Sequence, residues 1–277
     1  MNVAGFFVFF TVSFFLAKWC LIFICNCAIE LWVFFCQNSF VKEFFATLVD
    51  VEEIAPGIKF FDFQLHEDSR DFSFSTGQFI SVRVGPQVFR AYSLCTCRKD
   101  LPRFSLVIKL IPGGIGSTFF DKLQPGQQIP FQGPFGLMQL DQDVESGGAI
   151  FIATGVGIAP MRAFWRQLFS GKKATGQFDL FFGFRHESDG IFLPDIFALQ
   201  KEFSENFHVT LCVSKPLDTL PPNFQLGRVT AALGGKPEEF FTNRKIFLCG
   251  SRQMVEQVKE ILQAKGVDRA NIFQEIY

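Results

Sequence analysis

Residues 149–160 (AIFIATGVGIAP) decide the fold of this chain. An unbroken apolar run ends in a turn with glycine at positions 155 and 157, and Pro160 follows where a helix would begin. Such a run is typical of a strand buried on both faces, and proline suits the first helical position because its missing N–H is not needed there. The stretch therefore predicts a buried strand, a glycine turn and a helix, as found in parallel α/β sheets.

The glycine turn is also a candidate phosphate site. A helix N-terminus offers free N–H groups and the positive end of the helix dipole, and glycine lets a phosphate approach closely. The turn lacks the third glycine of the dinucleotide-binding fingerprint. On its own it is equally consistent with a tight turn that binds nothing.

Strands and helices alternate from this turn to the end of the chain. Strands are expected at 149–153, 178–184, 208–213, 245–249 and 272–276, and helices at 160–169, 195–203, 230–233 and 252–264. This alternation predicts a parallel sheet covered by helices, an α/β domain of the nucleotide-binding type, over residues 147–277.

The pattern before the glycine turn is different, because short strands follow one another directly. Apolar or alternating runs, separated by turns rich in proline and glycine, occur at 46–51, 58–65, 78–84, 87–95, 103–111 and 128–132. Such spacing predicts a small antiparallel β-barrel over residues 44–141, with one helical insert at 117–123.

Residues 1–43 are far more apolar than the rest of the chain. The segment from about 5 to 35 is long enough to cross a bilayer, which predicts a membrane helix. Lys42 is the next basic residue after it and would leave the catalytic domains in the cytoplasm. The alternatives are an amphipathic hairpin on the membrane and a start codon placed too far upstream.

Charge and cysteine content exclude some functions. The net charge of −1 does not favour nucleic acid as a partner. Scattered cysteines in a chain of this length indicate a reducing compartment rather than a disulfide framework. Four of them crowd the apolar N-terminus, but their spacing does not match an iron–sulfur run, so no metal is expected.

Further motifs lie on the predicted strands and turns. Arg90-Ala-Tyr92-Ser93 ends a barrel strand and combines a phosphate partner, a flat aromatic face and a hydroxyl. A glycine-rich turn at 113–118 leads into the helical insert. Cys249-Gly250 ends a parallel strand, at the sheet edge where ligands gather. Alone, the Arg90 motif is equally consistent with surface decoration of a strand, and a lone cysteine at a strand end is more often packing than catalysis.

Taken in order, the motifs resemble those of the ferredoxin–NADP reductase family over roughly residues 44–277. Two patterns lie in the barrel: R-x-Y-[ST] is matched by Arg90, Tyr92 and Ser93, and G-x-x-S by Gly114 and Ser117. Three lie in the α/β domain: G-x-G-x-x-P is matched by Gly155, Gly157 and Pro160, C-G by Cys249 and Gly250, and the terminal E-x-Y by Glu275 and Tyr277. Residues 1–43 have no counterpart in the family.

The resemblance implies FAD as the bound cofactor. It implies that Arg90 pairs with the FAD pyrophosphate, that Tyr92 stacks on the isoalloxazine, and that Ser93 hydrogen-bonds near N5. The remaining phosphate oxygens would be bound at the start of the helical insert, by Gly114, Gly116, Ser117 and Thr118.

The resemblance also assigns the nicotinamide side. Cys249, followed by Gly250, would contact the nicotinamide and help to place its C4 against the flavin N5. Glu275 would handle protons or tune flavin electrostatics. Tyr277 would cover the opposite flavin face and be displaced when the nicotinamide arrives. The reaction depends on aligning the hydride donor and acceptor and on excluding water.

NADP(H) is favoured over NAD(H). NAD-specific sites place a carboxylate near the end of the second strand, where this chain has Arg185. Ser214 and Lys215 resemble the family's Ser-Arg pair for the 2′-phosphate, although lysine lacks the guanidinium fork. The alternative is that Arg185 and Lys215 are ordinary solvated loop charges.

The predicted function is that of an FAD-dependent NAD(P)H oxidoreductase. Single electrons would pass to or from a carrier on a separate chain, such as a ferredoxin, a flavodoxin or an oxygenase component. One alternative is an NADH-dependent reductase subunit of a membrane or oxygenase complex. Another is a flavin-holding electron-transfer subunit without a nicotinamide reaction of its own.

Overall fold

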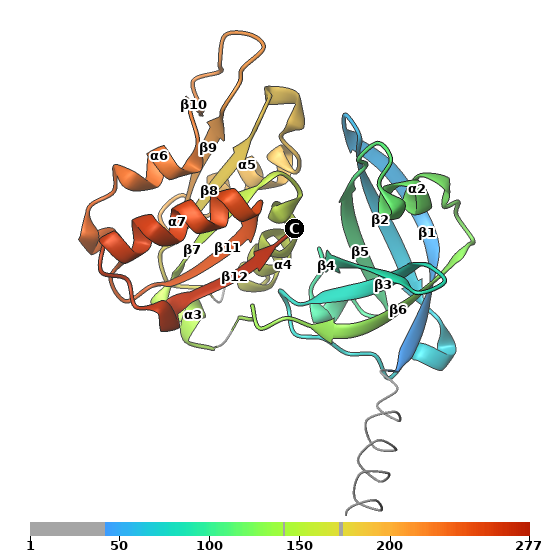
Figure 1. Cartoon of the computed structure of the whole chain (residues 1–277). Coiled ribbons are helices and arrows are strands. Elements are labelled where there is room, and N and C mark those ends of the chain that lie inside the picture. Colours follow the sequence, from blue (N-terminus) through green and yellow to red (C-terminus); the bar gives the residue numbers. More distant parts are fainter. Residues whose placement is uncertain (1–41, 141, 172–173) are drawn as a thin grey trace, which may run out of the picture. The chain divides into compact units, whose positions relative to one another are not determined.

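The structure is a computed structural model that describes residues 42–140, 142–171 and 174–277 (Figure 1). Residues Glu43–Tyr277 form one compact unit that contains two six-stranded sheets. The predicted membrane segment at about 5–35 lies outside the described residues. Within the described part, none of the helices combines the length and apolar character that crossing a membrane requires.

The first sheet is the predicted antiparallel barrel. Its strands are β1 (Glu43–Ala55), β2 (Ile58–Leu65), β3 (Phe79–Gly85), β4 (Val88–Ser93), β5 (Arg103–Lys109) and β6 (Gln128–Phe135). They lie in the order β4-β3-β6-β1-β2-β5, and one antiparallel bridge between Leu94 and Leu106 joins the two ends of this row. Alternate residues of β3 are buried, as expected for strands with one face toward a core.

The second sheet is the predicted parallel sheet. It contains β7 (Ala149–Thr154), β8 (Phe178–Phe184), β9 (Phe207–Val213), β10 (Phe224–Leu226), β11 (Lys245–Gly250) and β12 (Ile272–Ile276). Their order is β10-β9-β8-β7-β11-β12, and every neighbouring pair is parallel. All seven residues of β8 are buried, which explains its unbroken apolar run.

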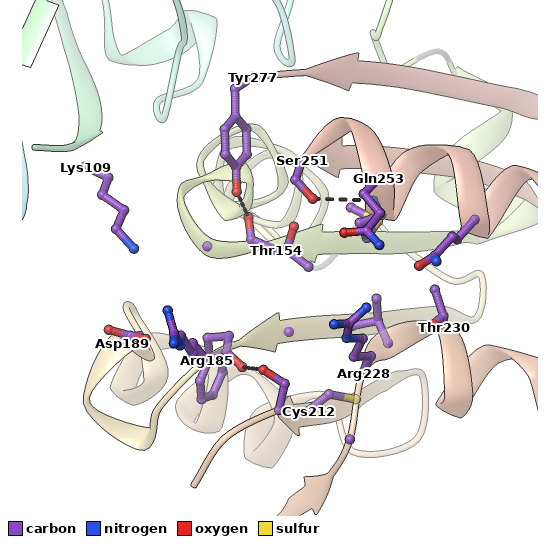
Figure 2. Close-up of a pocket in the computed structure, with 18 of the residues that line it drawn as sticks. Lys109, Thr154, Arg185, Asp189, Cys212, Arg228, Thr230, Ser251, Gln253 and Tyr277 are labelled. Carbon is purple, nitrogen blue, oxygen red and sulfur yellow. Dashed lines mark hydrogen bonds between the residues drawn. The ribbon is translucent and has the colours of Figure 1, made fainter. Parts of the chain in front are cut away.

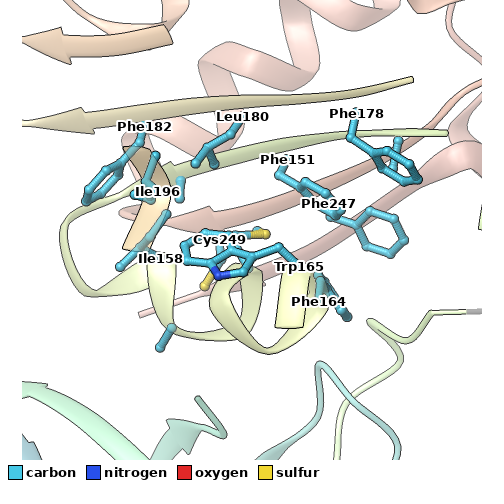
Figure 3. Packing of buried hydrophobic residues seen from close by; sticks show 14 of the residues in the cluster. Phe151, Ile158, Phe164, Trp165, Phe178, Leu180, Phe182, Ile196, Phe247 and Cys249 are labelled. Atoms are coloured by element: carbon cyan, nitrogen blue, oxygen red, sulfur yellow. The ribbon is translucent and has the colours of Figure 1, made fainter. Parts of the chain in front are cut away.

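Helices cover both faces of this sheet (Figure 1). Helices α4 (Ile158–Leu168) and α5 (Leu193–Glu202) pack on one apolar cluster, and α6 (Val229–Gly234) and α7 (Arg252–Ala264) pack on the other. The first cluster contains Trp165, Cys249 and several phenylalanine rings, among them Phe151, Phe164 and Phe247 (Figure 3). The remaining helices are α2 (Ile115–Lys122) in the barrel and α3 (Gln142–Gly147) between the sheets.

The order in which the chain adds strands to the sheet reverses between β7 and β11. The chain runs outward from β7 through β8, β9 and β10, then returns to place β11 on the other side of β7. Ligands of parallel sheets gather at the carboxyl edge of such a switch point. A Cβ on Gly157 would collide with the backbone carbonyl of Cys249, so glycine is what lets α4 begin directly against β11.

A buried ion pair lies at the opposite edge of the sheet. Arg244 donates through Nη2 to Asp179 Oδ2 at 2.7 Å and to the carbonyl oxygens of Ala149 and Gln177 at 2.8 and 2.9 Å. Asp179 is buried at the start of β8. One guanidinium therefore ties together the amino ends of neighbouring strands, far along the strands from the glycine turn.

Replacing Arg244 with methionine should lower the free energy of unfolding by about 3–5 kcal/mol, because it leaves the buried carboxylate of Asp179 without its partner. The measurement is equilibrium unfolding in urea. Arg252→Met is the control, since Arg252 forms only an exposed i,i+4 pair with Glu256 and should cost about 0.5 kcal/mol or less. Equal losses in the two variants would contradict this assignment.

Candidate functional site

Strand β4 presents the motif residues Arg90, Tyr92 and Ser93. Arg90 is exposed, and its Nη1 donates to its neighbour's carbonyl, Phe89 O, at 2.8 Å. None of the described carboxylates forms an ion pair with it. An arginine without a protein counter-ion is suited to bind a phosphate.

Helix α2 begins beside this strand. A Cβ on Gly116 would collide with the Tyr92 hydroxyl and lie 3.5 Å from Arg90 Cγ, so glycine allows the helix start to approach both side chains. The Tyr92 ring packs edge-on against Phe120 at 4.9 Å. Burial raises the pKa of Tyr92 to about 12, although the nearby charge of Arg90 opposes the shift. The phenol is therefore neutral.

The residues around the start of α2 that were predicted to bind phosphate make different hydrogen bonds in the structure. Gly114 is the N-cap of the helix, and its carbonyl accepts the N–H of Thr118 at 2.8 Å. The hydroxyl oxygen of Ser117 accepts the N–H of Ile111 at 2.8 Å, so it stabilises the turn. The first N–H groups of the helix have no intrahelical partner, and they lie beside Arg90.

Three predicted residues from the two sheets meet at the carboxyl edge of the parallel sheet. Cys249 and Glu275 are partners across β11 and β12. Ser93, from the barrel, donates to Glu275 Oε2 at 2.9 Å. Glu275 Oε1 is buried and has no hydrogen-bond partner among the described residues. The structure therefore brings together a hydroxyl, a carboxyl and a thiol, with one carboxyl oxygen left to bond a further group.

Burial controls the protonation of this cluster. It raises the pKa of Glu275 to about 7, and the hydrogen bond from Ser93 only partly opposes the shift. Burial also raises the pKa of the Cys249 thiol far above its ordinary value, and the nearby charge of Glu275 adds to this. The thiol is therefore neutral near pH 7, whereas the carboxyl is able to gain or lose a proton there.

The end of β6 supports the cluster, because Gly136 follows Phe135 directly. Gly136 has φ +99°, and a Cβ there would lie 2.8 Å from Glu275 Oε1 and 3.0 Å from the Phe79 ring. The structure shows that glycine is needed at position 136 because the carboxyl of Glu275 lies against it.

Tyr277 lies beside the glycine turn at the end of β7 (Figure 2). Its hydroxyl donates to the carbonyl of Thr154 at 2.7 Å, and a Cβ on Gly155, whose φ is +51°, would lie 3.0 Å from it. Pro160 was expected at the first helical position, but α4 begins two residues earlier. Proline is still tolerated there because the N–H groups of the first turn need no intrahelical partner.

A cavity of about 270 Å³ runs from this turn along the carboxyl ends of β8 and β9 (Figure 2). Arg185 and Ser214 line it, as the sequence predicts, together with Gly155 and Tyr277. Lys215 does not line it; its N–H donates to Arg185 O at 2.8 Å, and its carbonyl lies 2.6 Å from His186 Nδ1.

Three charged residues that the sequence analysis did not select also line the cavity: Lys109, Asp189 and Arg228. Arg228 is the N-cap residue of α6, and Gly227 before it has φ +125°. A glycine followed by a basic residue at a helix start is the pattern that could have identified it. Lys109 comes from β5 of the barrel, so no local pattern links it to the nucleotide turn.

Both domains of the chain are similar to those of known oxidoreductases. The family model described as an oxidoreductase FAD-binding domain matches residues 45–140, and the oxidoreductase NAD-binding domain matches residues 151–260. Ferredoxin–NADP reductase B of Sorangium cellulosum is 30% identical over 248 residues, which cover 85% of this chain and 98% of that protein.

A second relative and two solved structures extend the comparison. The electron transfer component of toluate 1,2-dioxygenase from Pseudomonas putida is 29% identical, and the match covers 73% of this chain and 58% of that protein. The Plasmodium falciparum ferredoxin–NADP⁺ reductase has a TM-score of 0.72 at 20% identity, covering 87% of this chain and 98% of that one. The Amycolatopsis cytochrome P450 reductase GcoB has a TM-score of 0.74 at 24% identity, covering 85% and 69%.

The raised pKa of Glu275 leads to a pH-dependent stability. Its pKa rises from an ordinary value of 4.5 to about 7 on folding, so the folded protein holds the proton more tightly and loses stability as the pH rises through this window. In the flavin-free protein, Glu275→Gln should therefore gain about 3 kcal/mol relative to the wild type between pH 4 and pH 8.

Urea unfolding at the two pH values measures this difference. Glu239→Gln is the control, because it removes a carboxylate from an exposed position on the surface. The assignment would be wrong if Glu275→Gln differed from the wild type by the same free energy at both pH values.

Proposed function

The chain belongs to the ferredoxin–NADP reductase family, and on this premise we propose how its residues exchange a hydride between NADP(H) and FAD. It is an FAD-dependent NAD(P)H oxidoreductase. Bound FAD takes up two electrons with a hydride and releases them one at a time. The observation that carries the proposal is the meeting of Ser93, Glu275 and Cys249 at the switch point of the parallel sheet.

FAD fits the barrel side of this meeting point. Arg90 and the free N–H groups at the start of α2 would bind the pyrophosphate, because both are positive and neither has an acidic partner among the described residues. The neutral phenol of Tyr92 would lie against the isoalloxazine. The Ser93 hydroxyl, which donates to Glu275 in the structure, would hold a hydrogen bond near N5.

The sheet side would position the nicotinamide. Tyr277 is more than half exposed and is bonded through its hydroxyl to one backbone carbonyl, so an incoming ring needs to break few contacts to displace it. Cys249 is a neutral thiol and would act as a polar wall rather than as a nucleophile. Glu275 would hold or release a proton at its buried Oε1, because its pKa is near 7.

The cavity supports NADP(H) as the nucleotide. Arg185, Arg228 and Lys109 bring positive charge to it, and the Ser214 hydroxyl adds a donor. A 2′-phosphate carries negative charge that this set would neutralise. Asp189 is the one acidic side chain among the described lining residues. Lys215 would act beside the cavity through its long side chain rather than in its wall.

The electron partner is proposed to be a separate one-electron carrier. The relatives include a ferredoxin–NADP reductase and an electron transfer component of a dioxygenase, which supports a ferredoxin, a flavodoxin or an oxygenase component. The chain spans only 58% of the dioxygenase component, so an NADH-dependent subunit of a larger complex is the second candidate. A membrane tether at about 5–35 stays a prediction, which fractionation of cell membranes would test.

Anaerobic titration tests the proposed function. The purified full chain should be yellow, and NADPH should bleach its flavin absorbance with a KM at least about tenfold below that of NADH, since a charged hydrogen bond contributes about 1.5–3 kcal/mol. A colourless protein, or a yellow one that neither nucleotide reduces, would reject the function. Faster reduction by NADH at low concentration would favour the second candidate.

Arg228→Ala tests the nucleotide assignment. The KM for NADPH should rise about tenfold or more, because a charged contact to the 2′-phosphate is lost, while the KM for NADH changes less than about twofold. NADH is thus an internal control for folding and flavin content. Arg252→Ala is the matched variant, since Arg252 is an exposed arginine outside the cavity wall. Equal changes for both nucleotides would remove Arg228 from 2′-phosphate recognition.

A further inference from the structure

The flavin motif is followed by a segment that packs against helix α4. Cys97 Sγ donates to the carbonyl of Ala163 at 3.2 Å, and Arg166 Nη1 lies 3.4 Å from Asp100 Oδ2. Helix α4 is the helix that begins at the nucleotide turn. Residues 95–100 and one face of α4 therefore form a seam between the barrel and the parallel sheet.

Arg162 lies at the centre of this seam and contacts three elements. Its Nη1 donates to Cys95 O at 3.4 Å, and its Nη2 lies 3.4 Å from Asp195 Oδ2 on α5. The guanidinium lies over the ring of Phe192 at 4.7 Å and over the ring of Phe60, on β2, at 5.7 Å. Its side chain is only 15% exposed.

The surroundings restrict Arg162 to this position. Its Nε is buried and has no hydrogen-bond partner among the described residues, so the two terminal nitrogens carry its polar contacts. Burial raises the pKa of Cys95 to about 11, which makes that thiol neutral and leaves Asp195 as the counter-charge. Phe192 has φ +59°, a conformation that costs free energy and persists where its neighbours hold it in place.

The contacts of Arg162 connect the two halves of the proposed reaction. Cys95, which it bonds, is two residues beyond Ser93 on the same extended segment. On the other side, Arg162 is on the helix whose start at Gly157 packs against the carbonyl of Cys249. A short, well-packed path therefore runs from the flavin motif through Arg162 to the nicotinamide edge.

We propose that Arg162 is a positioning residue for hydride transfer, which fixes the segment that carries Ser93 relative to the sheet edge that carries Cys249. The inference rests on the proposed function. In that reaction a hydride, one proton with two electrons, leaves C4 of NADPH for the flavin N5 and leaves NADP⁺. The rate of hydride transfer depends steeply on the distance between donor and acceptor, because a misplacement of about 1 Å lowers it about 100-fold.

Stopped-flow reduction of Arg162→Met by saturating NADPH tests the proposal. The hydride-transfer rate constant should fall about tenfold or more, and the long-wavelength absorbance of the nucleotide–flavin complex should weaken. Flavin content and the Kd of 2′,5′-ADP should not change, because the barrel cradle and the cavity are intact. Arg162→Lys should restore part of the rate, since it keeps the charge but loses the fork.

Two matched variants distinguish the effect of Arg162 from that of its neighbours. Arg166→Met removes a more exposed arginine from the same helix face and should change the rate less than about twofold. Asp195→Asn removes the negative charge on α5 but keeps an acceptor oxygen for Arg162 Nη2, and should change the rate less than about threefold. If Asp195→Asn were as slow as Arg162→Met, Arg162 would act by holding α5, and the proposal would be wrong.

The remaining outcomes also decide the question. A wild-type rate in flavin-loaded Arg162→Met would overturn the positioning role. If that variant did not retain FAD, Arg162→Lys would decide: slow transfer with full flavin supports the role, and a wild-type rate rejects it. Failure of NADPH and NADH to reduce the wild-type chain would reject the proposed function itself, and the positioning role with it.

Discussion

The rest of the site depends on the missing side chain at Gly157. Because no Cβ stands between them, the start of α4 packs directly on the carbonyl of Cys249, and the nucleotide turn and the thiol-bearing strand become one rigid piece. Arg162 and Ala163 follow on the same helix, and their hydrogen bonds to Cys95 and Cys97 attach the helix to the barrel. A single close backbone approach thus links the nucleotide turn, the sheet edge and the seam.

The two ends of the parallel sheet handle buried charge in opposite ways. At the amino edge, Arg244 and Asp179 satisfy each other and two backbone carbonyls. At the carboxyl edge, Glu275 is desolvated and one of its oxygens is unpartnered among the described residues. Proteins retain such unfavourable groups where a ligand or a reaction uses them. The unpartnered carboxyl therefore singles out the carboxyl edge as the candidate site.

Sequence reasoning was most accurate where the signal was local. The fully buried run of β8 and the regular periodicity of α7 were predicted with the bounds that the structure has. The three-residue strand β10 was missed, because so short a segment has no period. Helix α3 lies between the predicted bounds of the two domains, where no helix was expected.

The site shows the same division. The family resemblance assigned Ser93, Cys249 and Glu275 to one reaction. In the structure Ser93 donates to Glu275, and Glu275 lies opposite Cys249 on the neighbouring strand. Lys215 was selected because Ser214-Lys215 resembles the family's Ser-Arg pair, yet the cavity wall contains Arg228 and Lys109 instead. Lys109 reaches the wall only through the tertiary fold. The closure of the barrel has a related consequence. One isolated bridge, Leu94 to Leu106, closes it directly after Ser93, so transient opening there would loosen the strand end that is proposed to face the flavin. Flavin binding and barrel closure would then be thermodynamically coupled, because a ligand that binds only the closed barrel also stabilises it.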